Sequence, residues 1–289
     1  MNKKLMIITD SCSDIRDEEA VNLDVEVVPM QFSFGDELYQ EGVTMTVTEF
    51  YDKLIKSKIM PKTSQPSPEM FEKLYLKAQE LDQDVLVLTI SSGLSGTQQA
   101  ARLARDMVDN SERIHIVDTL SCLTGERLLV LNACRMRDSG LSASLIEEKL
   151  NEIKTRVRIF AVCDTLEYFY RGGRLSKAAM ILGSLIKIKP FVDLDENGKI
   201  RNFGKALGLA RGIKAACEFI PKNPIEEEYG LCYGFTLGEE NLQQLIEKTL
   251  PIFNVKDYSV KQIGATSGCH IGPGGICYAY ISKNKEIIR

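Results

Sequence analysis

Two hydroxyl-rich segments contain the residues of this sequence that are best suited to chemistry. They are Lys62–Pro68 (KTSQPSP) and Ser91–Thr97 (SSGLSGT), and each leads into a predicted helix. The second follows the apolar run 85–90, which predicts a buried strand. A strand that ends in such a loop before a helix presents free backbone N–H groups, which bind anions. Because the second loop lacks the lysine of a Gly-x-x-x-x-Gly-Lys phosphate loop, it predicts a site for one small anion, such as a carboxylate.

Thr63 and Ser95 are the hydroxyl residues that we expect to hold this anion. Ser64 and Ser67 can cap the helix after the first segment, and Thr97 can cap the helix expected from residue 98, which leaves Thr63 and Ser95 available. Taken alone, a threonine or serine in such a segment is more often an ordinary turn or cap residue. The neighbours expected to support the site are Ser64, Ser92, Gly96 and Thr97.

His270 is one of two histidines and lies in the glycine-rich stretch 266–275, which we expect to be a loop. Such a histidine can add a switchable charge to a site of neutral hydroxyls, and its pKa would rise beside a carboxylate. The alternative is an exposed or turn-stabilising imidazole. The other histidine, His115, falls inside an apolar strand pattern and is expected to be packed in a sheet.

A hydrolase or phosphatase is the competing interpretation, with Asp10 or Ser95 as its nucleophile. Asp10 follows the first predicted strand, but the order Asp10-Ser11-Cys12-Ser13-Asp14 differs from the Asp-x-Asp-x-Thr of such phosphatases, so capping and loop hydrogen bonds are favoured for both aspartates. Ser95 lacks a Gly-x-Ser-x-Gly elbow. Cys12 and Cys269 are weak nucleophile candidates because no base is fixed beside them. We therefore expect no catalytic residue.

The composition describes an ordinary globular protein. The 289 residues suffice for two domains, 44% are hydrophobic and 26% are charged. A net charge of −4 predicts no general attraction to nucleic acid or to anionic membranes. No signal peptide is recognisable and no apolar run approaches the roughly 18 residues of a membrane span. The eight cysteines form no Cys-x-x-Cys pair, which predicts reduced, mostly buried thiols, no metal site and a cytoplasmic location.

Strands alternate with helices in the first half, which predicts a mostly parallel, Rossmann-like α/β sheet. The expected strands are 6–10, 85–90 and 114–118, and the expected helices are 48–58, 68 onward, 98–109, 124–138 and 142–154. Residues 25–34 resemble one half-exposed strand, which Pro29 places at a sheet edge, and the turn at Gly35-Asp36 predicts a hairpin. We place the N-terminal α/β domain at 1–156, with this hairpin excursion at about 25–45.

We expect a C-terminal α/β domain over 157–289. Its expected strands are 158–162, 231–235, 259–265 and 276–281, and its expected helices are 177–185, 206–219 and 242–250, the last ending at Pro251. A turn is predicted at Asp195–Gly198. Basic residues gather in this half at Arg171, Arg174, Lys205 and Arg211. They form either a solvated surface or a docking surface for a partner.

The ordered set of these motifs resembles the DegV family of bacterial lipid-binding proteins from about residue 5 to residue 281. The resemblance rests on Ile8–Ser11, Val28–Met30, Lys62–Pro68, Ile90–Thr97, Arg171–Arg174 and His270–Gly274. It implies a two-domain α/β fold that buries one long-chain fatty acid between its domains. It also implies the role of fatty-acid-binding subunit of a two-component fatty acid kinase, whose separate catalytic subunit forms the acyl phosphate used in phospholipid synthesis.

The resemblance assigns roles to individual residues. Thr63, Ser95 and His270 match the positions that hold the fatty acid carboxylate. Arg211 matches an arginine associated with kinase docking, and Arg174 is a second docking candidate. The sequence departs from the family pattern at Gly212 and over Asp118–Cys122, which leaves acyl-chain preference open. The implied ligand is a fatty acid with no other cofactor, transient membrane contact is compatible with this role, and a lipid-responsive regulatory protein is the remaining alternative.

Overall fold

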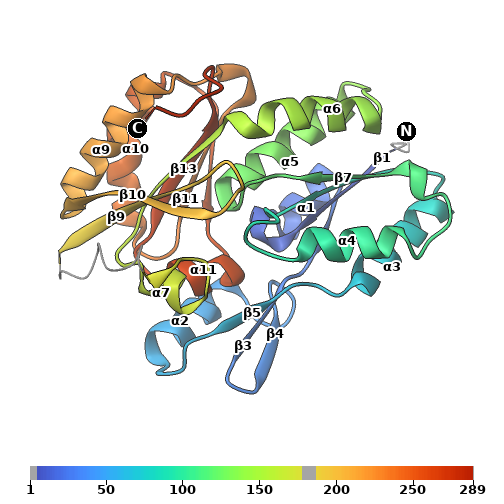
Figure 1. Ribbon diagram of the computed structural model, residues 1–289, viewed down its shortest axis with the longest axis horizontal. Coiled ribbons are helices and arrows are strands. Elements are labelled where there is room, and N and C mark those ends of the chain that lie inside the picture. Colours follow the sequence, from blue (N-terminus) through green and yellow to red (C-terminus); the bar gives the residue numbers. More distant parts are fainter. Residues whose placement is uncertain (1–4, 178–186, 289) are drawn as a thin grey trace.

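The computed structural model describes residues 5–177 and 187–288. It has a mixed α/β fold, as predicted. In Figure 1 the first half of the chain (blue to green) lies on the right, the second half (yellow to red) lies on the left, and a small sheet hangs below both. The fold therefore brings residues from both halves together along a central junction.

The first sheet is parallel throughout, with strand order β2-β1-β6-β7. Helices α3 and α4 pack against one face, and α5 and α6 pack against the other. Every residue of β1 is buried, as a central parallel strand requires. The bounds are β1 Leu5–Asp10, β2 Val25–Val28, β6 Asp84–Thr89, β7 Ile114–Asp118, α1 Asp17–Leu23, α3 Pro68–Glu80, α4 Thr97–Arg105, α5 Leu123–Asp138 and α6 Ala143–Ile153, with short 3₁₀ turns at Ser11–Ser13, Ser111–Arg113 and Lys154–Arg156.

The second sheet is mixed, with strand order β10-β9-β8-β13-β11-β12. Helices α9 and α10 pack on it through an aromatic core, and α5 lies between the two large sheets, where it contacts strands of both. The bounds are β8 Val157–Val162, β9 Ile188–Leu194, β10 Ile200–Leu207, β11 Leu231–Phe235, β12 Tyr258–Gln262, β13 Ile276–Ile281, α7 Glu167–Arg171, α9 Leu209–Lys222, α10 Glu239–Phe253 and α11 Ala265–Ile271, with a 3₁₀ turn at Glu227–Tyr229.

The small sheet has the order β4-β3-β5 and consists of β3 (Gln31–Phe34), β4 (Glu37–Gln40) and β5 (Lys62–Ser64). Helix α2 (Val47–Lys56) begins with a capping box between Thr46 and Glu49 and buries Phe50 and Tyr51 against this sheet. Helix α11 of the second half packs against α2, β3 and β5. The small sheet therefore links the two halves of the chain.

Several expected elements differ in the structure. The strand expected over 25–34 is two strands in two sheets, because the chain turns at Pro29-Met30; β2 does lie at a sheet edge, as expected. The loops expected at 62–64 and over most of 266–275 are strand β5 and helix α11. Helix α9 begins after Gly208, whose φ of 80° suits glycine, so 206–207 belong to β10. Pro251 lies inside α10 rather than ending it.

The turn at Asp195–Gly198 joins β9 and β10 as predicted. All eight cysteines are free thiols, and only Cys217 is partly exposed. His115 lies in β7, half-buried, with its Nδ1 2.6 Å from Glu147 Oε2. All but the first residue of the helix expected over 177–185 lies outside the residues that the structure describes.

Candidate functional site

A cavity lies between the two halves of the chain and contains about 860 Å³ of empty space, including its opening to solvent. Most of its wall is apolar and comes from both halves, for example Ile90, Leu123, Ile159, Phe169, Val192 and Ile276. Its polar residues include Thr63, Ser64, Gln65, Ser95, Arg174 and His270. The cavity thus combines a mostly apolar wall with a few polar side chains, which suits an amphipathic ligand.

Thr63 and His270 form the centre of the polar group. Thr63 lies on β5 and His270 lies near the end of α11, yet Thr63 Oγ1 is 2.9 Å from His270 Nε2 across 207 residues of sequence. Burial, and then the charge of Arg174, lower the pKa of His270 to about 4. The imidazole is therefore neutral at pH 7, and one ring nitrogen carries a proton that it can donate to an anion.

Gly172 lets the His270 ring take this position. A Cβ atom at Gly172 would lie 2.1 Å from His270 Nδ1, so only glycine fits there. Nδ1 is buried and has no hydrogen-bond partner among the described residues. The sequence pointed to Gly172 only as part of Arg171–Arg174, because nothing in that motif shows that it meets a histidine from another element.

Ser95 lines the same cavity, but its hydroxyl is 2.8 Å from Thr97 Oγ1. Thr97 is the first residue of α4 and Gly96 is the N-cap, so the expectation that Thr97 caps the helix and leaves Ser95 free was wrong. The Ser95 hydroxyl is held by another hydroxyl, at the edge of the space that Thr63 and His270 also border. The structure therefore brings all three predicted residues to one cavity and bonds two of them directly.

The other predicted supporting residues lie in different places. Ser64 borders the cavity, with its Oγ 3.4 Å from Gln31 Oε1. Ser92 is exposed, and its backbone N–H donates to Asp118 Oδ1 at 3.2 Å. Gly96 allows close approach of Gln65, whose Oε1 would be 1.9 Å from a Cβ there. Gln65 lines the cavity and was not singled out from the sequence, since its motif gave no reason to separate it from the neighbouring residues.

The two docking candidates have different environments. Arg174 lines the cavity, and its guanidinium donates to the carbonyls of Leu94 (3.1 Å) and Gly172 (2.7 Å). Its positive charge therefore acts within the cavity, where it lowers the pKa of His270. Arg211 is exposed on α9, where a partner could reach it.

Asp10, Cys12 and Cys269, three candidates for a catalytic nucleophile, are all buried. The Asp10 carboxylate accepts the backbone N–H groups of Cys12 (3.0 Å) and Ile90 (2.8 Å), which confirms the expected capping and loop bonding. Burial raises the pKa of Asp10 to about 6, although those N–H groups oppose the shift. Burial also raises the pKa of the Cys12 and Cys269 thiols, which disfavours the nucleophilic thiolate.

Two further properties follow from the described part of the chain. Within residues 5–177 and 187–288, no group of three or more His, Cys, Asp or Glu side chains is placed to hold a metal ion. Among the same residues, no helix is both long and apolar enough to cross a bilayer.

The whole chain is similar to known proteins. Residues 4–283 match the sequence model of the family described as "Uncharacterised protein, DegV family". A DegV domain-containing protein of Caldanaerobacter subterraneus is 33% identical over 94% of this chain and 96% of its own length. Two solved structures also superpose: a fatty-acid-binding DegV family protein of Thermus thermophilus (30% identity, TM-score 0.86, 96% of this chain and 99% of that one) and a stearic-acid-binding protein of Eubacterium ventriosum (27%, 0.85, 98% and 99%).

Proposed function

The chain belongs to the DegV family, and we propose that it binds one long-chain fatty acid and presents the carboxylate to a separate ATP-dependent kinase. The observation that carries the proposal is the cavity itself, in which an apolar wall from both halves surrounds a polar group centred on Thr63 and His270. Solved relatives of the same fold bind fatty acids, stearic acid in one case. A fatty acid has the matching chemistry, with a long tail and one anionic end.

The tail would supply most of the affinity. Burial of about fifteen methylene groups at roughly 0.8 kcal/mol each gives on the order of 12 kcal/mol before the costs of ordering the ligand. The polar residues instead determine which end of the ligand sits where, because a buried carboxylate without partners is very unfavourable. The Thr63 and Ser95 hydroxyls and the His270 N–H supply neutral donors, and Arg174 supplies a nearby positive charge.

A second protein is needed for chemistry on the carboxylate. The Ser91–Thr97 loop has no lysine to meet a β- or γ-phosphate. We therefore propose that the kinase partner binds ATP and forms the acyl phosphate, which enters phospholipid synthesis. In this account residues 1–156 and 157–289 act as two domains around the ligand, in the cytoplasm, with membrane contact limited to lipid exchange.

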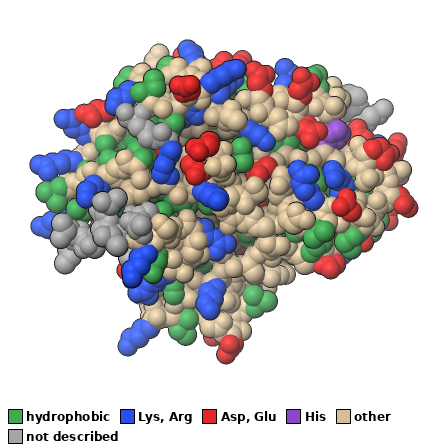
Figure 2. Space-filling view, viewed as in Figure 1, with side chains coloured by type: hydrophobic (Ala, Val, Ile, Leu, Met, Phe, Trp, Pro, Cys, Tyr) green, Lys and Arg blue, Asp and Glu red, His purple; other side chains and the backbone are tan. Residues whose placement is uncertain are grey.

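Exposed basic side chains of the second half offer a docking face for the partner. Figure 2 shows many Lys and Arg side chains at its left edge, where Figure 1 places α9 and β10. The exposed basic residues of these two elements include Lys205, Arg211 and Lys214. Lys214 Nζ lies 3.8 Å from Glu218 Oε1, one turn later on α9. Arg211 is our candidate anchor, because arginines are frequent among the residues that dominate interface energies.

Replacing Arg211 with alanine should leave fatty acid binding unchanged and slow the kinase-coupled reaction by roughly fivefold or more, as expected for an interface anchor. The measurement is acyl phosphate formation by the cognate kinase subunit with saturating fatty acid and with wild-type or variant protein. Lys222→Ala is the matched control, because Lys222 is an exposed basic residue at the other end of α9.

Three outcomes decide between the alternatives. Equal loss of lipid binding and turnover in Arg211→Ala would assign Arg211 to the fold or the cavity. Equal slowing by Lys222→Ala would indicate a general charge effect rather than a specific contact. Acyl phosphate formation by this chain and ATP without the kinase would overturn the proposed division of labour.

A further inference from the structure

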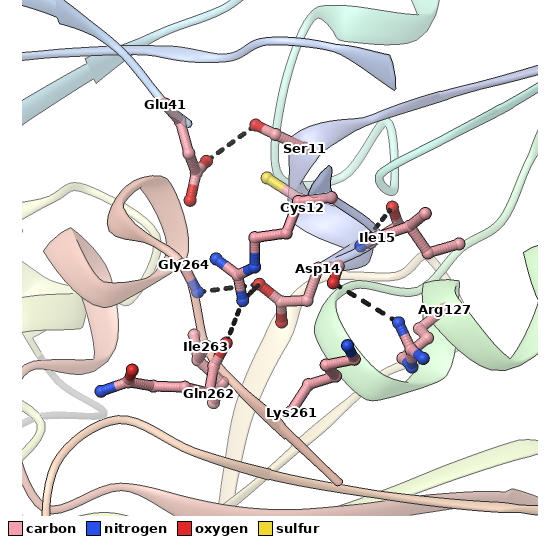
Figure 3. A network of polar contacts seen from close by, with 12 residues as sticks. Ser11, Cys12, Asp14, Ile15, Glu41, Arg127, Lys261, Gln262, Ile263 and Gly264 are labelled. Carbon is pink, nitrogen blue, oxygen red and sulfur yellow. Dashed lines mark hydrogen bonds and ion pairs between the residues drawn. The ribbon is translucent and has the colours of Figure 1, made fainter. Parts of the chain in front are cut away.

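Side chains from the first half of the chain hold the backbone of three consecutive residues in the second half. The carbonyl of Gln262 accepts a hydrogen bond from Arg16 Nη2, and the carbonyl of Ile263 accepts one from Tyr51 Oη at 2.9 Å. The N–H of Gly264 donates to Asp14 Oδ1 at 2.8 Å. Figure 3 shows Asp14 reaching the Gly264 amide at the centre of this network.

Glu41 lies in contact with Gly264, although its Oε1 has no hydrogen-bond partner among the described residues. Its side chain is buried, and Oε2 accepts a hydrogen bond from Ser11 Oγ at 2.7 Å. Its other oxygen, Oε1, lies so close to Gly264 that a Cβ there would be 1.9 Å away. Arg16 Nη2 also lies 3.4 Å from Asp14 Oδ1, so the gripping side chains contact one another. Residue 264 must therefore be glycine for Glu41 to approach the backbone.

Residues 262–264 lead directly into α11, the helix that carries His270. The partner of His270 is Thr63 on β5, which pairs with β3 in the small sheet. Tyr51 on α2 packs in the core of that same small sheet and also holds Ile263. The contacts to residues 262–264 thus fix the start of α11 relative to the sheet that supplies Thr63. The Thr63–His270 pair forms across that junction.

We propose that Asp14, Arg16, Glu41 and Tyr51 form a backbone clamp whose role is to position His270 beside Thr63 for recognition of the carboxylate. The inference rests on the proposed function, since it treats this pair as the headgroup site. The four side chains are positioning residues and act through α11. Apolar packing alone could hold a short helix, whereas a hydrogen bond between buried groups is directional and costly to leave unmade. The three bonds to residues 262–264 therefore favour one arrangement of this segment.

Tyr51→Phe tests the clamp with the smallest change, because it removes one hydroxyl and keeps the ring. Its matched control is Tyr75→Phe, since Tyr75 is also buried and its hydroxyl donates to the carbonyl of Ala101 at 3.1 Å, away from the cavity. Each variant loses one buried hydroxyl–carbonyl bond. We expect Tyr51→Phe to lower fatty acid affinity by several-fold and Tyr75→Phe to leave it unchanged.

The second readout is the NMR signal of the imidazoles in the ligand-free protein. Because the chain has two histidines, each can be assigned by comparison with a His115→Gln variant. Tyr51→Phe and Glu41→Gln should shift the His270 signals and leave those of His115 in place. Tyr75→Phe should shift neither.

Unchanged His270 signals and unchanged affinity in both folded clamp variants would overturn the clamp. A fall in affinity of the same size in Tyr75→Phe would show that the loss reports stability alone, which also contradicts the inference. If the wild-type protein binds no fatty acid, the proposed function fails by itself, while the His270 signals of the ligand-free variants still decide whether the clamp positions this residue.

Discussion

Fatty acid binding is expected to weaken by about 1–3 kcal/mol, or roughly 5- to 150-fold, in either Thr63→Val or His270→Ala. Each change removes a hydrogen-bonding group from the polar end of the cavity, where Thr63 Oγ1 and His270 Nε2 are 2.9 Å apart. Valine keeps the shape of threonine, so Thr63→Val isolates the hydroxyl. The measurement is the dissociation constant of delipidated protein for a long-chain fatty acid, by calorimetry or by a displaced fluorescent lipid.

The control is Ser67→Ala, which removes an exposed hydroxyl from the N-cap of α3, outside the cavity. Because the two site residues touch, the double variant should lose less affinity than the sum of the single losses. The methyl ester of the same fatty acid, which lacks the charge, should bind with little dependence on His270. Single variants that bind the acid as tightly as the wild type would remove Thr63 and His270 from the headgroup site.

The stability of Asp14→Asn relative to the wild type should increase as pH rises from 5 to 7.5. Burial raises the pKa of Asp14 from 3.8 to about 7, against the opposing charge of Arg16. The folded state thus holds this proton more tightly than the unfolded state. The stabilisation that this proton gives the wild-type protein is complete below the unfolded-state pKa of 3.8. It is lost as the pH rises through the folded-state pKa of about 7. Asparagine does not titrate, so the variant lacks this loss.

The expected change in the stability difference over this pH range is on the order of 1–3 kcal/mol, since one pKa unit corresponds to about 1.4 kcal/mol. Urea unfolding of both proteins at the two pH values measures it. Asparagine keeps an oxygen that can accept the Gly264 N–H bond, so the fold should survive the change. Asp36→Asn, in the exposed turn between β3 and β4, is the reference for removing one solvent-exposed carboxylate. A stability difference that stays constant with pH would contradict the raised pKa of Asp14.

The regular elements of the chain could be predicted because their signals are local. The buried run of β1 and the strand–loop–helix pattern around β6 appear directly in the sequence, and they led to the parallel sheet. These signals depend on periodicity and turn residues, which tertiary contacts did not override here. The loop that carries Ser95 follows β6 as predicted, whereas Thr63 reaches the same cavity from strand β5 of the small sheet, where a loop was expected.

Helix α11 could not be predicted, because its surroundings stabilise it rather than its composition. Glycines flank it, and Gly268 lies inside it, which lowers intrinsic helix propensity. Gly268 is needed because a Cβ there would be 2.7 Å from the Phe50 ring. Burial against α2 and the small sheet therefore decides the conformation of this segment. Likewise, the bonds of Asp14 and Arg16 to residues 262–264 span some 250 positions, and no local pattern reports them.

The central claim is that one fatty acid occupies the cavity, and mass spectrometry of gently purified protein tests it most directly. Native spectra give the stoichiometry, and organic extraction of the same sample identifies the ligand. Because an apolar cavity favours capture of lipid from the host cell, we expect one long-chain acyl group per chain, lost or reduced in His270→Ala. Protein that carries no acyl chain and does not bind added fatty acid would contradict the account, as would turnover of an ester or phosphate substrate in place of stable binding.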